Sequence, residues 1–150
     1  MRVVVQRVIK AQVVIDKEET RSIGKGLVVL LGIEMIDNSN DVEWLVNKII
    51  NLRIFNDIEG IMNHSLLDTE GHLMVVSQFT LMASTKKGNR PSYIRAAKHD
   101  HAVPLYELFL ERIHNQPGIK LVSGTFGKDM QIELVNDGPV TIQIDSKNRE

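Results

Sequence analysis

The 150-residue sequence contains no cysteine and no apolar stretch long enough to span a bilayer. The first absence excludes disulfide bonds, thiolate metal ligands and a cysteine nucleophile, and it suits a reducing compartment. The longest apolar run, residues 27–33, is far shorter than the roughly 20 residues of a transmembrane helix. No signal peptide is indicated, because Gln6, Arg7 and Lys10 interrupt the apolar start of the chain. We therefore expect a cytoplasmic protein with no membrane partner.

A strong charge of one sign is also missing. The sequence has 18 basic and 19 acidic residues, whereas proteins that coat nucleic acid carry a global positive excess. The charge is nevertheless uneven, because residues 84–101 contain a single acid, Asp100. This segment is either a solvated face, the usual meaning of such a run, or a small patch that contacts phosphate groups. Its basic residues are Lys86, Lys87, Arg90, Arg95 and Lys98.

The remaining composition is that of one globular domain. With 43% hydrophobic and 25% charged residues the chain can build a core, and no repeat, linker or low-complexity segment divides residues 1–150. Valine- and isoleucine-rich runs between turn residues predict about seven strands. They cover residues 2–9, 11–15, 27–33, 72–82, 119–122, 130–135 and 140–144, with a shorter strand near residues 53–55.

Two amphipathic helices are predicted between these strands. Asn40 is a suitable N-cap for the first helix, with Glu43 three residues later completing a capping box. The second helix is expected to begin near Pro104 and to stop before Pro117. Their apolar positions at helical spacing are Val42, Leu45, Val46, Ile49 and Ile50, and then Leu105, Leu108, Phe109 and Ile113. This element order indicates an α/β or α+β fold with a mixed sheet.

Standard catalytic signatures are absent. The sequence has no G-x-S-x-G elbow, no Walker loop, no G-x-G-x-x-G and no H-E-x-x-H motif. Among the histidines only His99 and His101 are close together, and their spacing at a helix entrance points the two rings apart. We therefore expect no metal site and no cofactor. A Ser-His-Asp triad is not excluded by sequence order, but nothing in the sequence indicates one.

Two short segments deserve a chemical interpretation. Ser77-Gln78-Phe79-Thr80 places polar side chains within an apolar strand, where they need hydrogen-bond partners. A regular strand would put Ser77 and Phe79 on one face and Gln78 and Thr80 on the other, so a shared site requires a bend or the end of the strand. The second segment, Asn136-Asp137-Gly138-Pro139-Val140-Thr141, is also well suited to a hairpin turn. Taken singly, neither segment identifies an enzyme.

Together these segments resemble the paired signature of the D-aminoacyl-tRNA deacylase family. The likeness extends along the chain, through the opening Met1-Arg2-Val3-Val4-Val5-Gln6-Arg7-Val8, the Lys87-Gly88-Asn89-Arg90-Pro91-Ser92 loop, and Thr125-Phe126-Gly127 with Met130. The resemblance implies a single α/β domain with a curved, barrel-like mixed sheet, two main helices and a homodimeric assembly. It also implies a hydrolase that cleaves the ester between tRNA and a D-amino acid, without a cofactor.

The resemblance also suggests roles for individual residues. Gly138 and Pro139, joined by a cis bond in the family, would reach into the partner subunit's pocket and exclude L-amino acids, and Arg7 would hold them in place. Phe126 and Met130 would bind substrate, and the loop carrying Lys86, Lys87 and Arg90 would lie near the tRNA 3′ end. The catalytic segment would comprise Ser77, Gln78, Phe79 and Thr80.

The chemistry of the ester is consistent with these roles. The neighbouring 2′-hydroxyl already activates the ester, so backbone N–H groups of Phe79 and Thr80 that stabilise an oxyanion would suffice, each donor being worth about 10²–10³ in rate. Thr80 as a nucleophile is an alternative, although no base is evident for its proton. Because glycine has no side chain to exclude, glycyl-tRNA should also be cleaved. A binding module without turnover, and a different esterase that uses Ser77 or Thr80 as its nucleophile, are the other interpretations.

Overall fold

The computed structural model describes residues 1–149 and contains one large mixed sheet with two main helices. This sheet has six strands, of which five follow the order β2-β1-β3-β6-β7. The sixth strand, β8, pairs with β1 along nearly its whole length. A separate small hairpin is formed by β4 (Phe55–Asn56) and β5 (Met62–His64). The other elements are β1 (Arg2–Ile15), β2 (Glu19–Ile23), β3 (Gly26–Gly32), α1 (Ser39–Asn51), β6 (His72–Ser77), the 3-10 helix η1 (Phe79–Met82), α2 (His99–His114), β7 (Lys120–Ser123) and β8 (Met130–Asp145).

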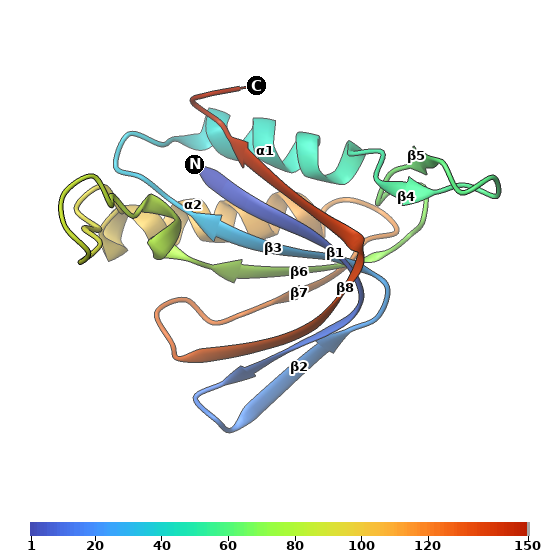
Figure 1. The fold of residues 1–150 in the computed structure, drawn as a ribbon, viewed down its shortest axis with the longest axis horizontal. Helices are drawn as coiled ribbons and strands as arrows, with labels where there is room; N and C mark the ends of the chain where they lie inside the picture. The colour runs from blue at the N-terminus through green and yellow to red at the C-terminus, as the bar shows by residue number, and fades with distance from the viewer. Residues whose placement is uncertain (150) are drawn as a thin grey trace.

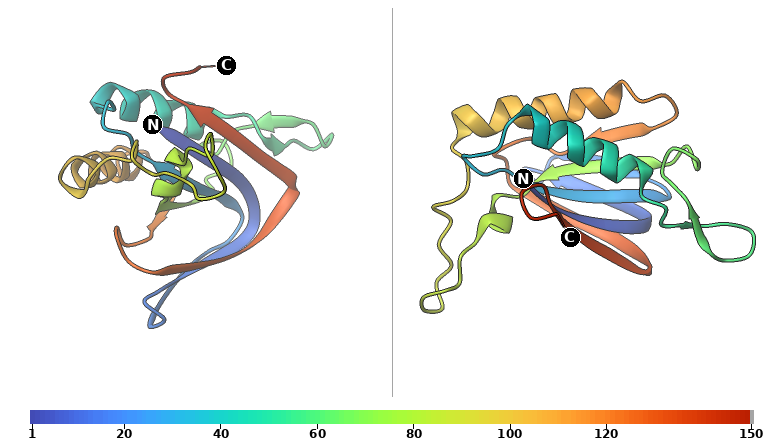
Figure 2. Two further views of the ribbon diagram at one scale, coloured as in Figure 1. Left: turned by 60° about the vertical axis from the view of Figure 1, so that its left-hand side comes forward. Right: turned by 90° about the horizontal axis from the view of Figure 1, so that it is seen from above.

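The sheet curls until its two edges nearly meet. Strand β1 pairs antiparallel with β2, β3 and β8, whereas β3–β6 and β6–β7 are parallel pairs. The long strands β1 and β8 bend together, which gives the curved shape seen in Figures 1 and 2. Across the gap, Arg21 of β2 donates a hydrogen bond of 2.6 Å to the carbonyl of Ser123 at the end of β7. The predicted barrel-like mixed sheet with two helices is confirmed.

The core is divided between the two faces of the sheet. Helices α1 and α2 lie together on one face (Figure 2), where they bury the apolar side chains of β1, β3 and β6. The inside of the curl holds a second cluster that includes Val8, Val13, Val28 and Met74, all of them fully buried. Helix α1 buries the face that its spacing predicts, with Val42, Leu45, Val46, Ile49 and Ile50 inside.

Several predicted boundaries are wrong. Residues 2–9 and 11–15 form the single strand β1, and residues 130–135 and 140–144 belong to the single strand β8. The turn residues Asn136 to Pro139 therefore do not reverse the chain; they form an irregularity in the ladder where β8 passes Arg7. Strand β2 was not predicted, because its sequence is mostly polar and exposed and so lacks the apolar alternation of a half-buried strand.

Both helices begin earlier than predicted. The N-cap of α1 is Asn38, whose capping-box partner is Asp41, so Asn40 and Glu43 do not form the cap. Helix α2 begins at His99 and contains Pro104 in its interior. Pro104 is on the exposed side of the helix and forgoes only the bond to Asp100, near the helix start, which explains why the helix accommodates it.

Candidate active site

The segment Ser77 to Thr80 lies where a central strand leaves the sheet. Ser77 is the last residue of β6, and the N–H of Gln78 donates to the carbonyl of Leu31 on β3 at 2.8 Å. The chain then turns into η1 rather than continuing as the predicted strand to residue 82. This turn removes the strand alternation that would have separated the four residues onto opposite faces.

The polar groups of this turn are only partly satisfied within the chain. The side-chain amide of Gln78 donates to the Thr80 hydroxyl oxygen at 2.5 Å. Within residues 1–149, the backbone N–H groups of Phe79 and Thr80 have no hydrogen-bond acceptor. Two adjacent free donors at the start of a helical turn form a suitable binding place for a developing oxyanion.

A cavity of about 410 Å³ opens beside this turn. Its wall brings together the end of β6, the start of α2 and the segment that leads into β8. Residues from all three regions line it, including Val76, Ser77, Gln78, Phe79, His99, Ala102, Phe126 and Met130. The structure therefore places the predicted residues Phe126 and Met130 in the same cavity as Ser77, Gln78 and Phe79, about 50 positions apart in the chain.

The rings around Phe126 stabilise the far wall of this cavity. Phe126 makes edge-to-face contacts with His99 at 5.6 Å and with Tyr106 at 5.5 Å between ring centroids. The Tyr106 hydroxyl donates to the carbonyl of Val75, and burial raises the pKa of Tyr106, so the phenol remains a neutral donor. His99 was not predicted as a cavity residue. No sequence pattern marks it, because His99 meets the other cavity residues only in the folded chain.

Gly138 and Pro139 lie in the irregular middle of β8, and both are exposed. Their peptide bond is cis, and Gly138 has a φ of +119°, a region that L side chains rarely adopt. A Cβ atom added to Gly138 would lie 2.9 Å from Cγ2 of Val140 and 3.0 Å from Nη2 of Arg7. Only glycine therefore fits at this position.

Arg7 is the buried support of this exposed turn. Its side chain is 7% exposed, and Nη1 donates to the carbonyl of Ile54 at 2.5 Å. Its Nε lies 3.1 Å from Oδ2 of Asp137 in an ion pair without hydrogen-bond alignment. Asn136 adds a second brace, because its side-chain amide donates to the carbonyl of Arg7 at 2.9 Å. Arg7 therefore contacts both residues that precede Gly138, and its holding role stays a prediction.

Gly138 and the Ser77 turn are far apart within one chain. Gly138 lies opposite Arg7, which pairs with Leu27 of β3, whereas Ser77 pairs with Leu31 of the same strand. Three strand spacings across the sheet and four residues along it correspond to roughly 20 Å. In Figure 1 the bend of β8 and the yellow-green helix η1 accordingly lie at opposite ends of the sheet. One chain cannot combine both features in one cavity.

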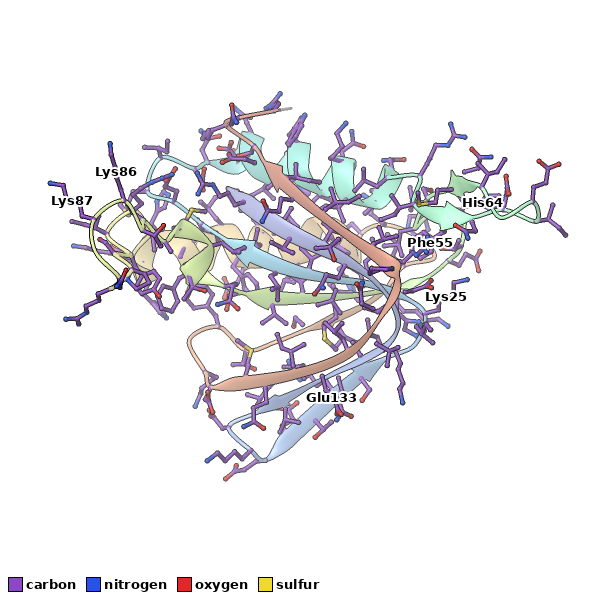
Figure 3. All side chains as sticks on the ribbon, in the orientation of Figure 1. Lys25, Phe55, His64, Lys86, Lys87 and Glu133 are labelled. Carbon is purple, nitrogen blue, oxygen red and sulfur yellow. The ribbon has the colours of Figure 1, made fainter. Side chains whose placement is uncertain are left out.

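The predicted basic residues lie on a loop that projects beyond η1. Two hydrogen bonds between the backbones of Ser84 and Ser92, of 2.8 and 2.9 Å, close this loop at its base. Lys86 and Lys87 point into solvent, away from the body of the molecule (Figure 3). Within residues 1–149, neither these lysines nor Arg90 lies within 4 Å of a carboxylate oxygen.

Comparison with known proteins identifies the class of enzyme. Residues 4–145 match the protein family described as D-Tyr-tRNA(Tyr) deacylase. D-aminoacyl-tRNA deacylases from Azobacteroides pseudotrichonymphae and Parabacteroides distasonis are 61% and 59% identical, each over the full length of both chains. The chain therefore belongs to the D-aminoacyl-tRNA deacylase family, which confirms the predicted hydrolase class and its role in tRNA proofreading.

Solved structures show the same fold. A structure described as c-Myc DNA Unwinding Element Binding Protein is 40% identical, with a TM-score of 0.88 over 97% of this chain and 98% of that one. A probable eukaryotic D-amino acid tRNA deacylase superposes with a TM-score of 0.80 over 95% and 97% of the two chains, at 18% identity. No helix in the described part of the chain is long and apolar enough to cross a membrane.

Proposed function

We propose that this chain deacylates D-aminoacyl-tRNA in the cavity beside η1, with the ester carbonyl held by the backbone N–H groups of Phe79 and Thr80. The observation that carries the proposal is that both donors lack an acceptor within residues 1–149. Water adds to the carbonyl carbon, and the negative oxygen formed in that step accepts from both N–H groups. Collapse of this intermediate breaks the bond to the ribose oxygen, which leaves with a proton as the tRNA hydroxyl.

Thr80 acts in this proposal as a positioned hydroxyl and not as the nucleophile. A nucleophilic threonine needs a neighbouring base to take its proton. The group that contacts its oxygen is the amide of Gln78, which donates a hydrogen bond and cannot accept a proton in this orientation. The substrate's own 2′-hydroxyl is therefore the better candidate to position or activate the water.

The chiral filter is proposed to come from a second copy of the chain. Gly138 and Pro139 are exposed and about 20 Å from the Ser77 turn of their own chain, so only a partner can bring them to it. A rigid backbone placed where an L side chain would project rejects the L form, whereas differences in soft apolar contact amount to only about 1–3 kcal/mol. Glycyl-tRNA carries no side chain to reject, so some of it should be hydrolysed.

A two-fold arrangement would supply both sites at once. A surface hollow of about 640 Å³ is lined by the start of β1, by α1 and by the end of β8, and it includes Leu81 of η1. Two copies packed through this face would each place Gly138 and Pro139 against the other's η1, since a two-fold interface uses the same patch on both subunits. We therefore propose a homodimer with two shared sites.

The proposed substrate is the 3′ end of a tRNA that carries a D-amino acid or glycine. The side chains of Phe126 and Met130 provide apolar contacts to it, and Lys86, Lys87 and Arg90 approach its phosphate groups. We place the reaction in the cytoplasm, where aminoacyl-tRNA is used, and we propose that residues 1–150 act as one domain.

Complementation between two inactive variants tests the shared site. One chain would carry Phe79→Pro, which removes one of the two N–H donors at the first position of η1, and the other Gly138→Val, so that each homodimer lacks one half of both sites. After mixing and reassociation, half of the dimers are hybrids and each hybrid holds one intact site, so about a quarter of the wild-type activity should return. Activity that stays absent after confirmed subunit exchange would contradict a site built from two chains.

A further inference from the structure

A pair of exposed aromatic rings lies at the mouth of the cavity. Phe79 is 57% exposed and Tyr93 is 39% exposed, and their rings meet edge to face with centroids 5.1 Å apart. Phe79 lines the cavity, whereas Tyr93 lies outside its wall. Tyr93 thus extends the apolar surface from the cavity toward solvent.

The position of Tyr93 is well defined by its neighbours. It directly follows Ser92, whose backbone forms two hydrogen bonds with Ser84 at the base of the basic loop. Its own carbonyl accepts from the N–H of Ala96 at 2.9 Å. The ring is therefore held between the cavity and the loop that carries Lys86 and Lys87.

The surroundings of Tyr93 match single-stranded nucleic acid better than protein. Residues 85–95 are all exposed and contain no acidic side chain. Lysine is depleted at the centres of protein interfaces, whereas aromatic rings bordered by cations are the usual platform for unpaired bases. Arg95 is already paired with Glu34, whereas Lys86, Lys87 and Arg90 on the loop form no ion pair within residues 1–149.

We propose that Tyr93 stacks on an unpaired nucleobase of the tRNA 3′ end, one that precedes the terminal, aminoacylated nucleotide. The inference rests on the proposed function, because the terminal nucleotide must place its ester beside Phe79 and Thr80. The preceding bases then leave the cavity past Phe79 and meet the Tyr93 ring next. Their phosphate groups run toward Lys86, Lys87 and Arg90.

Kinetics with a long and a short substrate separate this role from a structural one. Tyr93→Ala should raise KM for D-tyrosyl-tRNA by about 5- to 150-fold, the range measured when a stacking ring is removed. Hydrolysis of D-tyrosyl-adenosine, which lacks the preceding nucleotides, should keep its KM. Tyr93→Phe retains a ring and should behave like the wild type with both substrates. Ile94→Ala is the matched control, because Ile94 is adjacent, 88% exposed and not aromatic.

Four results would overturn the inference. An equal loss on both substrates would mean that Tyr93 acts only by supporting Phe79. Unchanged kinetics with both substrates would mean that the ring binds no base. Dissociation of the dimer by Tyr93→Ala, measured by analytical ultracentrifugation, would assign the ring to a protein interface. A wild-type chain that hydrolyses neither substrate would overturn the proposed function together with this inference, whereas an active wild type isolates the role of Tyr93.

Discussion

Arg7 and Asp137 form an ion pair of 3.1 Å that joins a buried side chain of β1 to the exposed turn of β8. The pair connects the interior of the sheet with the residue that precedes Gly138. Because the guanidinium also donates to the carbonyl of Ile54, one side chain ties three segments together. The position of the proposed chiral filter therefore depends on Arg7, whose side chain is buried.

Arg7→Lys should destabilise the fold despite keeping the charge. A single ammonium group cannot reach both the Ile54 carbonyl and the Asp137 carboxylate with the geometry of the guanidinium fork. We expect the free energy of unfolding in urea to fall by about 1.5–3 kcal/mol, the usual contribution of a charged hydrogen bond. Arg53→Lys is the control: within residues 1–149 the exposed Arg53 side chain donates hydrogen bonds only to Asn63, so the change in stability should be less than about 0.5 kcal/mol. Equal losses of unfolding free energy in Arg7→Lys and Arg53→Lys would contradict the role of Arg7 in supporting the Gly138 turn.

Gly138→Ala should impair catalysis more than it impairs folding. The new Cβ would press on Val140 and on Arg7 at a φ that alanine rarely adopts, which displaces the turn. A displacement of about 1 Å typically costs on the order of 10² in rate, so kcat/KM for D-aminoacyl-tRNA should fall about that much. Gly60→Ala shares the positive φ but has nothing within 4 Å, and it should keep full activity. Activity within twofold of wild type for Gly138→Ala would exclude the turn from the site.

Thr80→Ala distinguishes a positioned hydroxyl from a nucleophile. If the backbone and the substrate carry the chemistry, kcat should fall by no more than about 10-fold, in line with the loss of one hydrogen bond of Gln78. Loss of a true nucleophile would cost on the order of 10⁴ or more. Rapid-quench mass spectrometry of the wild type should show no acyl-enzyme. An acyl group on Thr80 would contradict this mechanism.

Replacing Lys86, Lys87 and Arg90 together with alanine should weaken tRNA binding and reduce its salt dependence. Each phosphate contact contributes about 0.7–0.9 to the slope of log K against log salt concentration. Loss of three contacts should therefore lower that slope by about 2–3, measured by filter binding between 50 and 200 mM salt. An unchanged slope would mean that the loop is only a solvated surface.

Asp41 should make folding stability depend on pH below about 4. Burial by itself would raise its pKa, but hydrogen bonds from Lys147, Ser146 and the Asn38 backbone outweigh burial and lower the pKa from its ordinary value of 3.8. The carboxylate therefore stabilises the fold above pH 3.8, and this contribution is lost as the pH falls through the lower folded-state pKa. Asp41→Asn should cost about 1.5–3 kcal/mol at pH 7 and progressively less below pH 3.8.

The control for Asp41 is Glu107→Gln. Glu107 is exposed and makes no ion pair within residues 1–149, so its removal should leave the pH dependence unchanged. Thermal unfolding between pH 2.5 and 7 measures both variants. A difference in unfolding free energy between Asp41→Asn and wild type that stays constant across this pH range would contradict the stabilising role of the Asp41 carboxylate.

The sequence predicts the fold well where apolar spacing decides the structure. Helix α1 buries the residues that its spacing selects, and β3 and β6 are buried strands as expected. Spacing does not predict the end of β6 at Ser77, because Phe79, Leu81 and Met82 keep an apolar pattern after the chain has turned. Nor does it predict the long pairing of β1 with β8. In that pairing Gly138 and Pro139 form an irregularity within one strand, whereas the sequence favours a hairpin turn.

The site is predictable in part. The motif residues Ser77, Gln78 and Phe79 do share a cavity with Phe126 and Met130. The family resemblance supplied these residues, since no spacing relates positions that meet only after the sheet has curled. His99 and Tyr93 were missed, because a lone histidine and a lone tyrosine in polar segments carry no pattern. Their positions at the cavity depend on where α2 begins, at His99, and on how the basic loop closes, just before Tyr93.

The most direct measurement is the hydrolysis of matched D-tyrosyl-tRNA and L-tyrosyl-tRNA by the purified protein, without added metal. We predict rapid release of D-tyrosine while L-tyrosyl-tRNA decays at its uncatalysed rate, and partial hydrolysis of glycyl-tRNA in a parallel assay. Equal cleavage of the D and L esters would contradict the proposal that Gly138 and Pro139 form a chiral filter. No cleavage of either ester would contradict deacylation by this chain.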